Sequence, residues 1–116
     1  MARLYRIACG VINYTVEETT SLLAKTFDID FQKYSVHPNC IVGVFFGTRI
    51  YIQNNYSEST KAWLEIDESE FPVIIYADSD TGRDKDKRSI HKYLKQQLSQ
   101  RDYITFLKEE IIEQAD

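Results

Sequence analysis

The sequence predicts an α+β fold: an antiparallel sheet of about five strands, with an N-terminal helix and two C-terminal helices packed on it. Strand-like runs follow one another through the middle of the chain, whereas helical spacing of apolar residues is confined to one early segment and the last third. Runs of strands followed by runs of helices are typical of α+β proteins. At 116 residues the chain is predicted to form one domain over 1–116.

The first two predicted elements are a strand and a helix. The opening segment MARLYRIACGVINY (1–14) is predicted as a strand, because Arg6 interrupts the apolar run that an export signal would need. Thr15 and Glu18 have the spacing of a capping box. The helix predicted over 16–27 has apolar residues at helical spacing, namely Val16, Leu22, Leu23 and Phe27.

The middle of the chain reads as strands. FQKYSV (31–36) is followed by a predicted turn over 37–39. CIVGVFF (40–46) is apolar on both faces, which is typical of a central strand covered on both sides. Gly47 and Thr48 then lead into RIYIQN (49–54), and the two runs are predicted to form a hairpin.

KAWLEI (61–66) holds the only tryptophan of the chain and is predicted as a further strand. Because side chains alternate along a strand, its aliphatic residues would face the core and Trp63 would point outward, on the same side as Tyr51. A shift of one residue, or a helix covering that side of the sheet, would instead place Trp63 in the core. Both readings stay open.

The last predicted elements are one strand and two helices. Val73–Tyr76 reads as a buried strand and 80–87 as a charged loop. A first helical stripe consists of Ile90, Tyr93, Leu94 and Leu98. A second stripe consists of Tyr103, Ile104, Phe106, Leu107, Ile111 and Ile112. It predicts a final helix capped by Asp102.

Charge is distributed unevenly about a net value of −4. Residues 58–80 hold seven acids and one base, whereas residues 81–101 hold seven bases and two acids. An acidic surface attracts basic partners, and an acidic protein is a poor general binder of nucleic acid, so no direct nucleic-acid binding is predicted. The apolar runs are too short to span a membrane, and no membrane partner is predicted.

The residues with possible chemistry form no complete site. Asp78 and Asp80 follow a buried strand, where carboxylates can bind a metal ion or transfer protons, but the same residues favour turns. A small enzyme using these two with His91 or a metal is the alternative function. Cys9 and Cys40 are predicted to be reduced thiols of a cytoplasmic protein, with a single disulfide left open. No catalytic residue, metal or cofactor is predicted.

A partner-binding surface is the favoured site. Aromatic side chains ringed by polar groups are typical of protein interfaces. Tyr51 and Trp63 are predicted to be its anchors. The acids predicted to surround them are Glu58, Glu65, Asp67, Glu68 and Glu70.

Residues 30–78 carry a pattern shared with a known group of proteins. It consists of Tyr34-x-x-His37, Gly43-x-Phe45-Phe46, Ile50-x-Ile52-Gln53-Asn54 and Glu70-Phe71-Pro72-Val73-Ile74-Ile75-Tyr76. The pattern resembles immunity proteins of bacterial toxin systems, including those of contact-dependent growth inhibition. The resemblance implies a non-enzymatic cytoplasmic inhibitor that binds a cognate toxin domain, often a basic nuclease. A regulatory or phage anti-defence binding protein is a further alternative, and the oligomeric state is left open.

Overall fold

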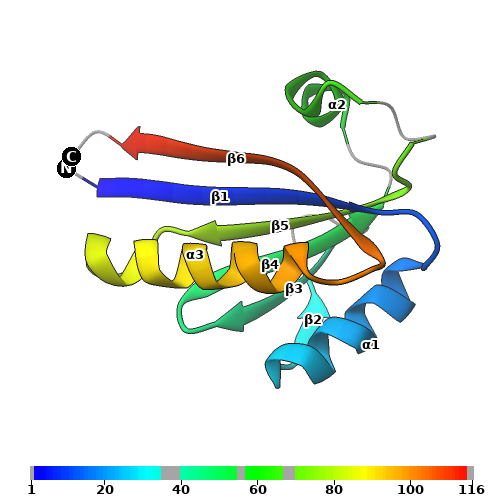
Figure 1. Ribbon diagram of the computed structural model, residues 1–116, viewed down its shortest axis with the longest axis horizontal. Helices are drawn as coiled ribbons and strands as arrows, with labels where there is room; N and C mark the ends of the chain where they lie inside the picture. The colour runs from blue at the N-terminus through cyan, green and yellow to red at the C-terminus, as the bar shows by residue number, and fades with distance from the viewer. Residues whose placement is uncertain (1, 35–39, 55–56, 67–69, 115–116) are drawn as a thin grey trace.

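A six-stranded antiparallel sheet organises the structure, a computed structural model that describes residues 2–34, 40–54, 57–66 and 70–114 (Figure 1). The elements in chain order are β1 (Ala2–Val11), α1 (Val16–Phe27), β2 (Phe31–Lys33), β3 (Cys40–Phe45), β4 (Thr48–Asn54), α2 (Glu58–Leu64), β5 (Val73–Ser79), α3 (Asp84–Ser99) and β6 (Ile104–Gln114). The strand order is β2-β3-β4-β5-β1-β6. The predicted α+β class and antiparallel sheet are therefore confirmed, with six strands in place of about five.

The first and last strands are neighbours in the sheet. β1 pairs with β5 on one side and with β6 on the other, so that Ala2 lies opposite Gln114 and Val11 opposite Ile104. The start of β1 and the end of β6 lie at the same end of the sheet in Figure 1. A β-bulge interrupts the β1–β6 pairing at Ala8 and Cys9.

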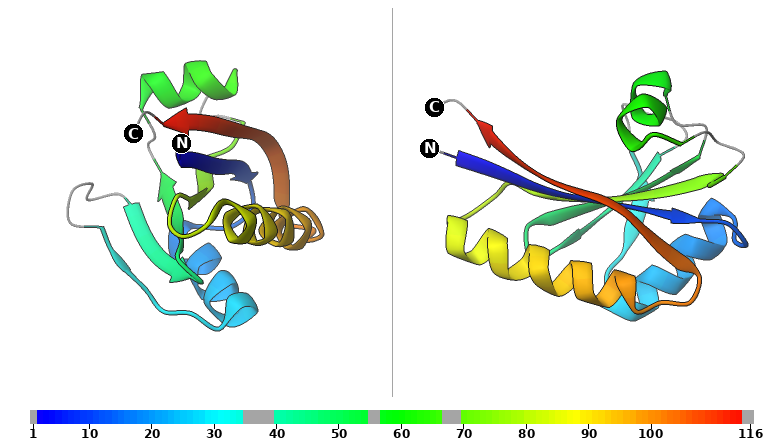
Figure 2. Two further views of the ribbon diagram at one scale, coloured as in Figure 1. Left: turned by 90° about the vertical axis from the view of Figure 1, so that its left-hand side faces the viewer. Right: turned by 45° about the horizontal axis from the view of Figure 1, so that its top comes forward.

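Two helices cover one face of the sheet, here called the helical face. α1 and α3 pack on it (Figure 2), and the core between them and the strands includes Ile7, Ile50 and Ile75. The α1 bounds match the prediction, and the Thr15–Glu18 capping box is present in both directions. Near the start of α3, the buried Lys87 donates from Nζ to the Arg3 carbonyl oxygen at 2.7 Å.

The opposite side of the sheet, here called the second face, is covered only in part. α2 lies over it, because Leu64 of this helix packs with Ala8 of β1 and Ile74 of β5. Figure 2 shows α2 on the other side of the sheet from α1 and α3. The two predicted helices that exist, α1 and α3, therefore share one face, and α2, which was not predicted, lies on the other.

Several predicted elements need correction. The strand predicted over 61–66 is instead the end of helix α2, which stops at Leu64 and has Glu65 as its C-cap; Ser57 caps its start by accepting from the Thr60 backbone. The predicted final helix is strand β6, so Asp102 caps no helix there. Of the two predicted C-terminal helices, only α3 exists, and it begins at Asp84, within the predicted loop over 80–87.

The predicted hairpin over 40–54 is confirmed by the antiparallel pairing of β3 with β4. However, β3 is not the central strand. It lies next to the edge strand β2, and Val44 is 57% exposed, so apolar content on both faces did not indicate full burial. Strand β2 ends at Lys33, and the predicted turn over 37–39 lies outside the described residues.

Candidate functional site

A row of charges crosses the second face. Four residues follow one another in register from β6 to β4, in the order Glu110, Arg6, Asp78 and Arg49. Their formal charges alternate in sign. Opposite charges on neighbouring strands stabilise a sheet, so this charge row is a structural link across four strands as well as a surface.

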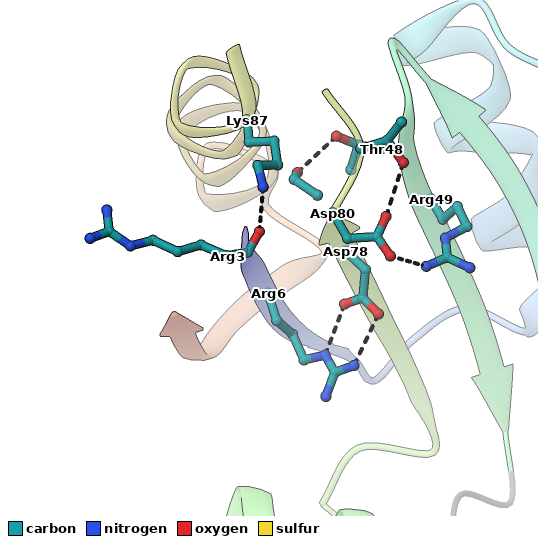
Figure 3. Close-up of polar contacts among 9 residues, drawn as sticks. Arg3, Arg6, Thr48, Arg49, Asp78, Asp80 and Lys87 are labelled. Carbon is teal, nitrogen blue, oxygen red and sulfur yellow. Dashed lines mark hydrogen bonds and ion pairs between the residues drawn. The ribbon is translucent and has the colours of Figure 1, made fainter. Parts of the chain in front are cut away.

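The two arginines of the charge row are held by carboxylates (Figure 3). Arg6 donates to Asp78 twice, from Nε to Oδ1 at 2.8 Å and from Nη2 to Oδ2 at 3.0 Å. Arg49 donates from Nη2 to Oδ2 of Asp80. The hydrogen bonds to Asp78 raise the pKa of the Arg6 guanidinium. Because Asp78 is only 7% exposed, loss of Arg6 would leave a buried carboxylate without its partner.

A row of aromatic rings runs beside the charges. Tyr51 of β4 and Tyr76 of β5 are direct partners in register. Tyr34 continues this aromatic row on one side, with its ring centroid 5.5 Å from that of Tyr51 at an interplanar angle of 63°. Trp63 of α2 continues it on the other side, 6.2 Å from Tyr76 at 40°. All four side chains are half-buried.

Trp63 is held in place by cations from two strands. Lys108 of β6 lies with Nζ 4.8 Å from the Trp63 ring centroid and donates to the Trp63 carbonyl oxygen at 2.9 Å. The Arg6 guanidinium lies 6.0 Å from the Trp63 ring and 5.7 Å from the Tyr76 ring. These cation–π contacts fix the indole against the sheet while part of it stays accessible.

Two tyrosines of the aromatic row, Tyr51 and Tyr76, remain protonated at neutral pH. Burial raises the pKa of both Tyr51 and Tyr76. Their hydroxyl groups are therefore available as hydrogen-bond donors.

The predicted acids gather around α2. Glu58, Glu65 and Glu70 are exposed and line a shallow concavity together with Lys61 and Ile66. Lys61 donates to Glu58 at 3.0 Å. The remaining two predicted acids, Asp67 and Glu68, lie outside the described residues. The structure thus places three of the five predicted acids in one concavity at α2, the helix that carries Trp63.

The residues of the enzyme alternative do not converge. Asp78 points to the second face and Asp80 binds Arg49, whereas His91 belongs to α3 on the helical face. There, His91 Nε2 lies 2.9 Å from Glu109 Oε2. Within the described ranges, no three His, Cys, Asp or Glu side chains are grouped so as to hold a metal ion.

Three side chains of this surface were not anticipated from the sequence. They are Arg6, Tyr76 and Lys108, which surround Trp63. Because side chains alternate along β1, Arg6 lies on the other face of the sheet from its apolar neighbour Ile7, and the sequence could have predicted this. No local pattern gives the order β5-β1-β6 that brings the three together.

Comparison with protein-family models, curated proteins and solved structures finds no match for this chain. None of the helices in the described part of the chain is long and apolar enough to cross a membrane.

Proposed function

We propose that the chain is a non-enzymatic protein-binding inhibitor, an immunity protein that neutralises a cognate toxin domain in the cytoplasm of the producing cell. The half-buried Trp63, held between Arg6 and Lys108 beside Tyr76, is the observation that carries the proposal. Tryptophan, tyrosine and arginine contribute most of the binding energy at protein interfaces. A side chain already fixed by its neighbours also loses little entropy on binding.

The exposed acids of α2 and of the segment after it suit a basic partner. Glu58, Glu65 and Glu70 are exposed and line one concavity, whereas both arginines of the charge row are already bound to carboxylates. Nuclease domains have basic active sites because they bind a polyanion, and complementary charge accelerates association. A basic nuclease is therefore the toxin class that this surface fits best.

Affinity capture from the native cell tests the proposal. The wild-type chain is compared with a Tyr51→Ala, Trp63→Ala variant and with Tyr93→Ala, which removes an exposed tyrosine of α3 on the helical face. We expect the wild type and Tyr93→Ala to retain the same protein, which is toxic when expressed alone and harmless when expressed together with the wild type. We expect the double variant to bind that protein at least about 100-fold more weakly.

Each variant is first checked by circular dichroism and urea unfolding, so that loss of binding is compared only between folded proteins. Equal retention of the protein by the wild type and the folded double variant would remove the second face as the binding surface. Recovery of a small molecule or metal ion, with no protein, would favour the enzyme that uses Asp78 and Asp80. Recovery of a non-toxic regulatory protein would favour the regulatory alternative.

A further inference from the structure

We propose that the chain forms a two-fold symmetric dimer in which the second half of β6 pairs with the same segment of another copy. Two six-stranded sheets would thereby join into one. The inference goes beyond the proposed function, because it concerns an edge of the sheet and not the aromatic row or the concavity at α2. The partner that it names is a second copy of this chain.

β6 leaves a long edge of the sheet open. It is the last strand in the order β2-β3-β4-β5-β1-β6 and has 11 residues, whereas β2 at the other edge has three. An edge strand presents unpaired backbone N–H and C=O groups to any strand that reaches it, and proteins usually keep such strands short or interrupt them. The length of β2 protects its edge, and the length of β6 does not.

Only the first half of β6 is interrupted. The β-bulge lies where Ala8 pairs with Lys108 and Cys9 pairs with Phe106. Residues 108–114, here called the edge segment, pair regularly with β1 and contain no proline. Figure 1 shows that the end of β6 lies away from α2. A further antiparallel strand can therefore be added along the edge segment.

The charges of the edge segment do not guard it. Charged side chains, lysine above all, usually protect an open edge. In the edge segment each charged side chain has a neighbour of opposite charge or a hydrogen-bond acceptor within its own chain: these are Lys108 with the Trp63 carbonyl oxygen, Glu109 with Lys95, Glu110 with Arg6, and Glu113 with Arg3. Ile111, by contrast, is 58% exposed. The edge segment thus offers unpaired backbone groups and an exposed isoleucine to another strand.

Charge selects one register for the pairing of two copies. When two identical antiparallel strands pair about a two-fold axis, one residue lies opposite itself. Like charges directly opposite each other destabilise a sheet, so a charged residue is disfavoured at the axis. Ile111 at the axis would bring Glu109 opposite Glu113. Ile112 at the axis brings no two acids opposite each other, because the pairs are then Ile112 with itself, Ile111 with Glu113, and Glu110 with Gln114.

This register also covers both isoleucines. Ile112 pairs with Leu4 of β1 and would meet Ile112 of the other copy directly. Ile111 pairs with Tyr5 on the helical face and would lie diagonal to Ile111 of the other copy. Directly opposite Cβ atoms are about 5 Å apart and diagonal ones about 7–8 Å, which long side chains can bridge. Apolar contacts would therefore form on both faces of the joined sheet.

The dimer is compatible with the proposed function. A two-fold axis perpendicular to the sheet keeps the second faces of the two copies on the same side. The aromatic row consists of side chains from β4, β5, α2 and Tyr34, so pairing along the edge segment leaves it uncovered. An interface of few residue pairs is small, and we expect a weak, concentration-dependent dimer.

Sedimentation equilibrium of the full chain tests the inference. We expect a monomer–dimer equilibrium between about 1 μM and about 1 mM. Ile112→Glu would place two glutamates opposite each other at the axis and is expected to weaken the dimer at least about tenfold. Val44→Glu is the matched control, because it makes the same kind of change at an exposed residue of β3, away from β6, and should leave the dimer unchanged.

An exchange of charge between two variants tests the position of the axis. Ile112→Lys is mixed in equal amounts with Ile112→Glu, so that lysine faces glutamate only in the heterodimer. We expect the heterodimer to be at least about tenfold tighter than either homodimer. A folding defect cannot produce this rescue, and circular dichroism with urea unfolding shows which variants are folded.

Hydrogen exchange of the wild type supplies a measurement that needs no variant. Pairing of two edge segments protects the backbone N–H groups that point away from β1. We expect exchange of amides within 110–114 to slow as the protein concentration rises, whereas exchange within β2 stays constant. Unchanged exchange within 110–114 in a dimeric sample would overturn the inference.

The remaining outcomes also decide between the proposals. A monomer at every concentration would overturn this inference, and so would a dimer in which the two Ile112 variants show no preference for each other. Assemblies larger than a dimer would overturn it as well, because two-fold pairing of β6 closes on itself. Neutralisation of a toxin by a monomeric chain would leave the proposed function standing alone. A dimer paired through β6 that binds no toxin would leave only this inference.

Discussion

Phe46 occupies a position that disfavours it for two reasons. It is the first of two turn residues between β3 and β4, with φ of 49°, followed by Gly47 with φ of 82°. Two positive φ values in such a turn favour asparagine and glycine, and a bulky residue there is strained. In addition, the Phe46 side chain is 79% exposed. Phe46→Asn is therefore expected to stabilise the protein by about 0.5–1 kcal/mol, measured by urea unfolding.

Gly47→Ala is the matched control for this turn. Its positive φ is costly for any residue with a Cβ, so this substitution is expected to destabilise the protein by about 1 kcal/mol. A loss of stability in Phe46→Asn would show that the Phe46 ring, which contacts Phe45 at 4.8 Å between centroids, contributes more than the backbone strain costs.

Cys9 is expected to be chemically inert in the folded protein. Its side chain is fully buried on the helical face, and this burial raises its pKa to about 12. The reactive thiolate is therefore almost absent at neutral pH. In a Cys40→Ser variant at pH 8, we expect no reaction of Cys9 with a disulfide reagent until urea unfolds the chain. Fast labelling of the folded variant would show that β1 opens locally.

At the scale of elements, Glu109 links β6 to α3. It accepts from Lys95 Nζ at 2.7 Å and lies 2.9 Å from His91 Nε2. The Lys95 hydrogen bond, followed by that of His91, lowers the pKa of Glu109. Because the folded pKa is lower than the unfolded one, this stabilisation is present above the unfolded value. It is lost as pH falls through the folded value.

Glu109→Gln is therefore expected to lower the free energy of unfolding by less than about 1 kcal/mol at neutral pH, since the side chain is partly exposed and screened. The difference from the wild type should shrink as pH falls below the unfolded pKa of glutamate, measured by urea unfolding along a pH series. A difference that stays constant with pH would assign the effect to packing and not to charge.

The sequence predicted α1 fully, because its capping box and apolar spacing are both local signals. It did not predict α2, which has only seven residues. Over seven residues, the alternation of a strand and the spacing of a helix can place the same residues on one side, so the pattern does not distinguish the two structures. Ser57 and Glu58 were the available signal, since they supply the N-cap and an acid in the first turn.

Strand β6 was predicted as a helix because the alternation of its side chains between the two faces of the sheet shifts by one residue midway along the strand. The bulge opposite Ala8 and Cys9 leaves Phe106 on the helical face and Lys108, two residues later, on the second face, where regular alternation would put both on one face. The apolar residues on the two sides of the bulge then repeat at helical intervals. Its Lys and Glu residues also favour helices, but pairing along the whole of β1 overrides that preference.

The candidate surface was predictable only in part. Tyr51 and Trp63 do lie on the same side of the sheet, but Trp63 reaches it from a helix packed over that side and not from a strand. The side of the sheet on which Tyr51 lies could be predicted from β4 alone, because Tyr51 alternates with the buried Ile50 and Ile52. The position of α2 depends on contacts with β1 and β5, which are distant in sequence.

At the scale of the whole molecule, the sheet separates the two charged segments of the sequence. Acids near α2 lie on the second face, whereas the basic residues of α3 lie on the helical face. Arg83 and Arg88 are paired with acids of their own helix. The basic partner that we propose would thereby be attracted to the side of the sheet on which the aromatic row lies.

The pairing of Ala2 with Gln114 predicts that the chain tolerates circular permutation. Joining its two ends by a short glycine-rich linker and opening it between the exposed Gly82 and Arg83 turns β6 and β1 into a hairpin. We expect the same native circular dichroism and faster refolding, because closing a short loop costs less entropy than closing a long one. Refolding is measured by stopped-flow Trp63 fluorescence.

A permutant opened within the β3–β4 turn at Gly47 provides the comparison, since it carries the same linker but breaks an existing hairpin. If both permutants refold more slowly than the wild type, the β1–β6 pairing forms after the step that limits folding.

The place of β1 between β5 and β6 also has a consequence during synthesis of the chain. β1 leaves the ribosome before both of its hydrogen-bonding neighbours, β5 and β6, which lie in the second half of the sequence. At about 5–20 residues per second, β1 waits roughly 5 to 20 s for its last partner. Until then, its buried residues Ile7, Cys9 and Val11 are exposed to solvent. Nascent chains stalled before residue 104 should therefore be bound by chaperones that recognise apolar strands, and should be released once β6 has emerged.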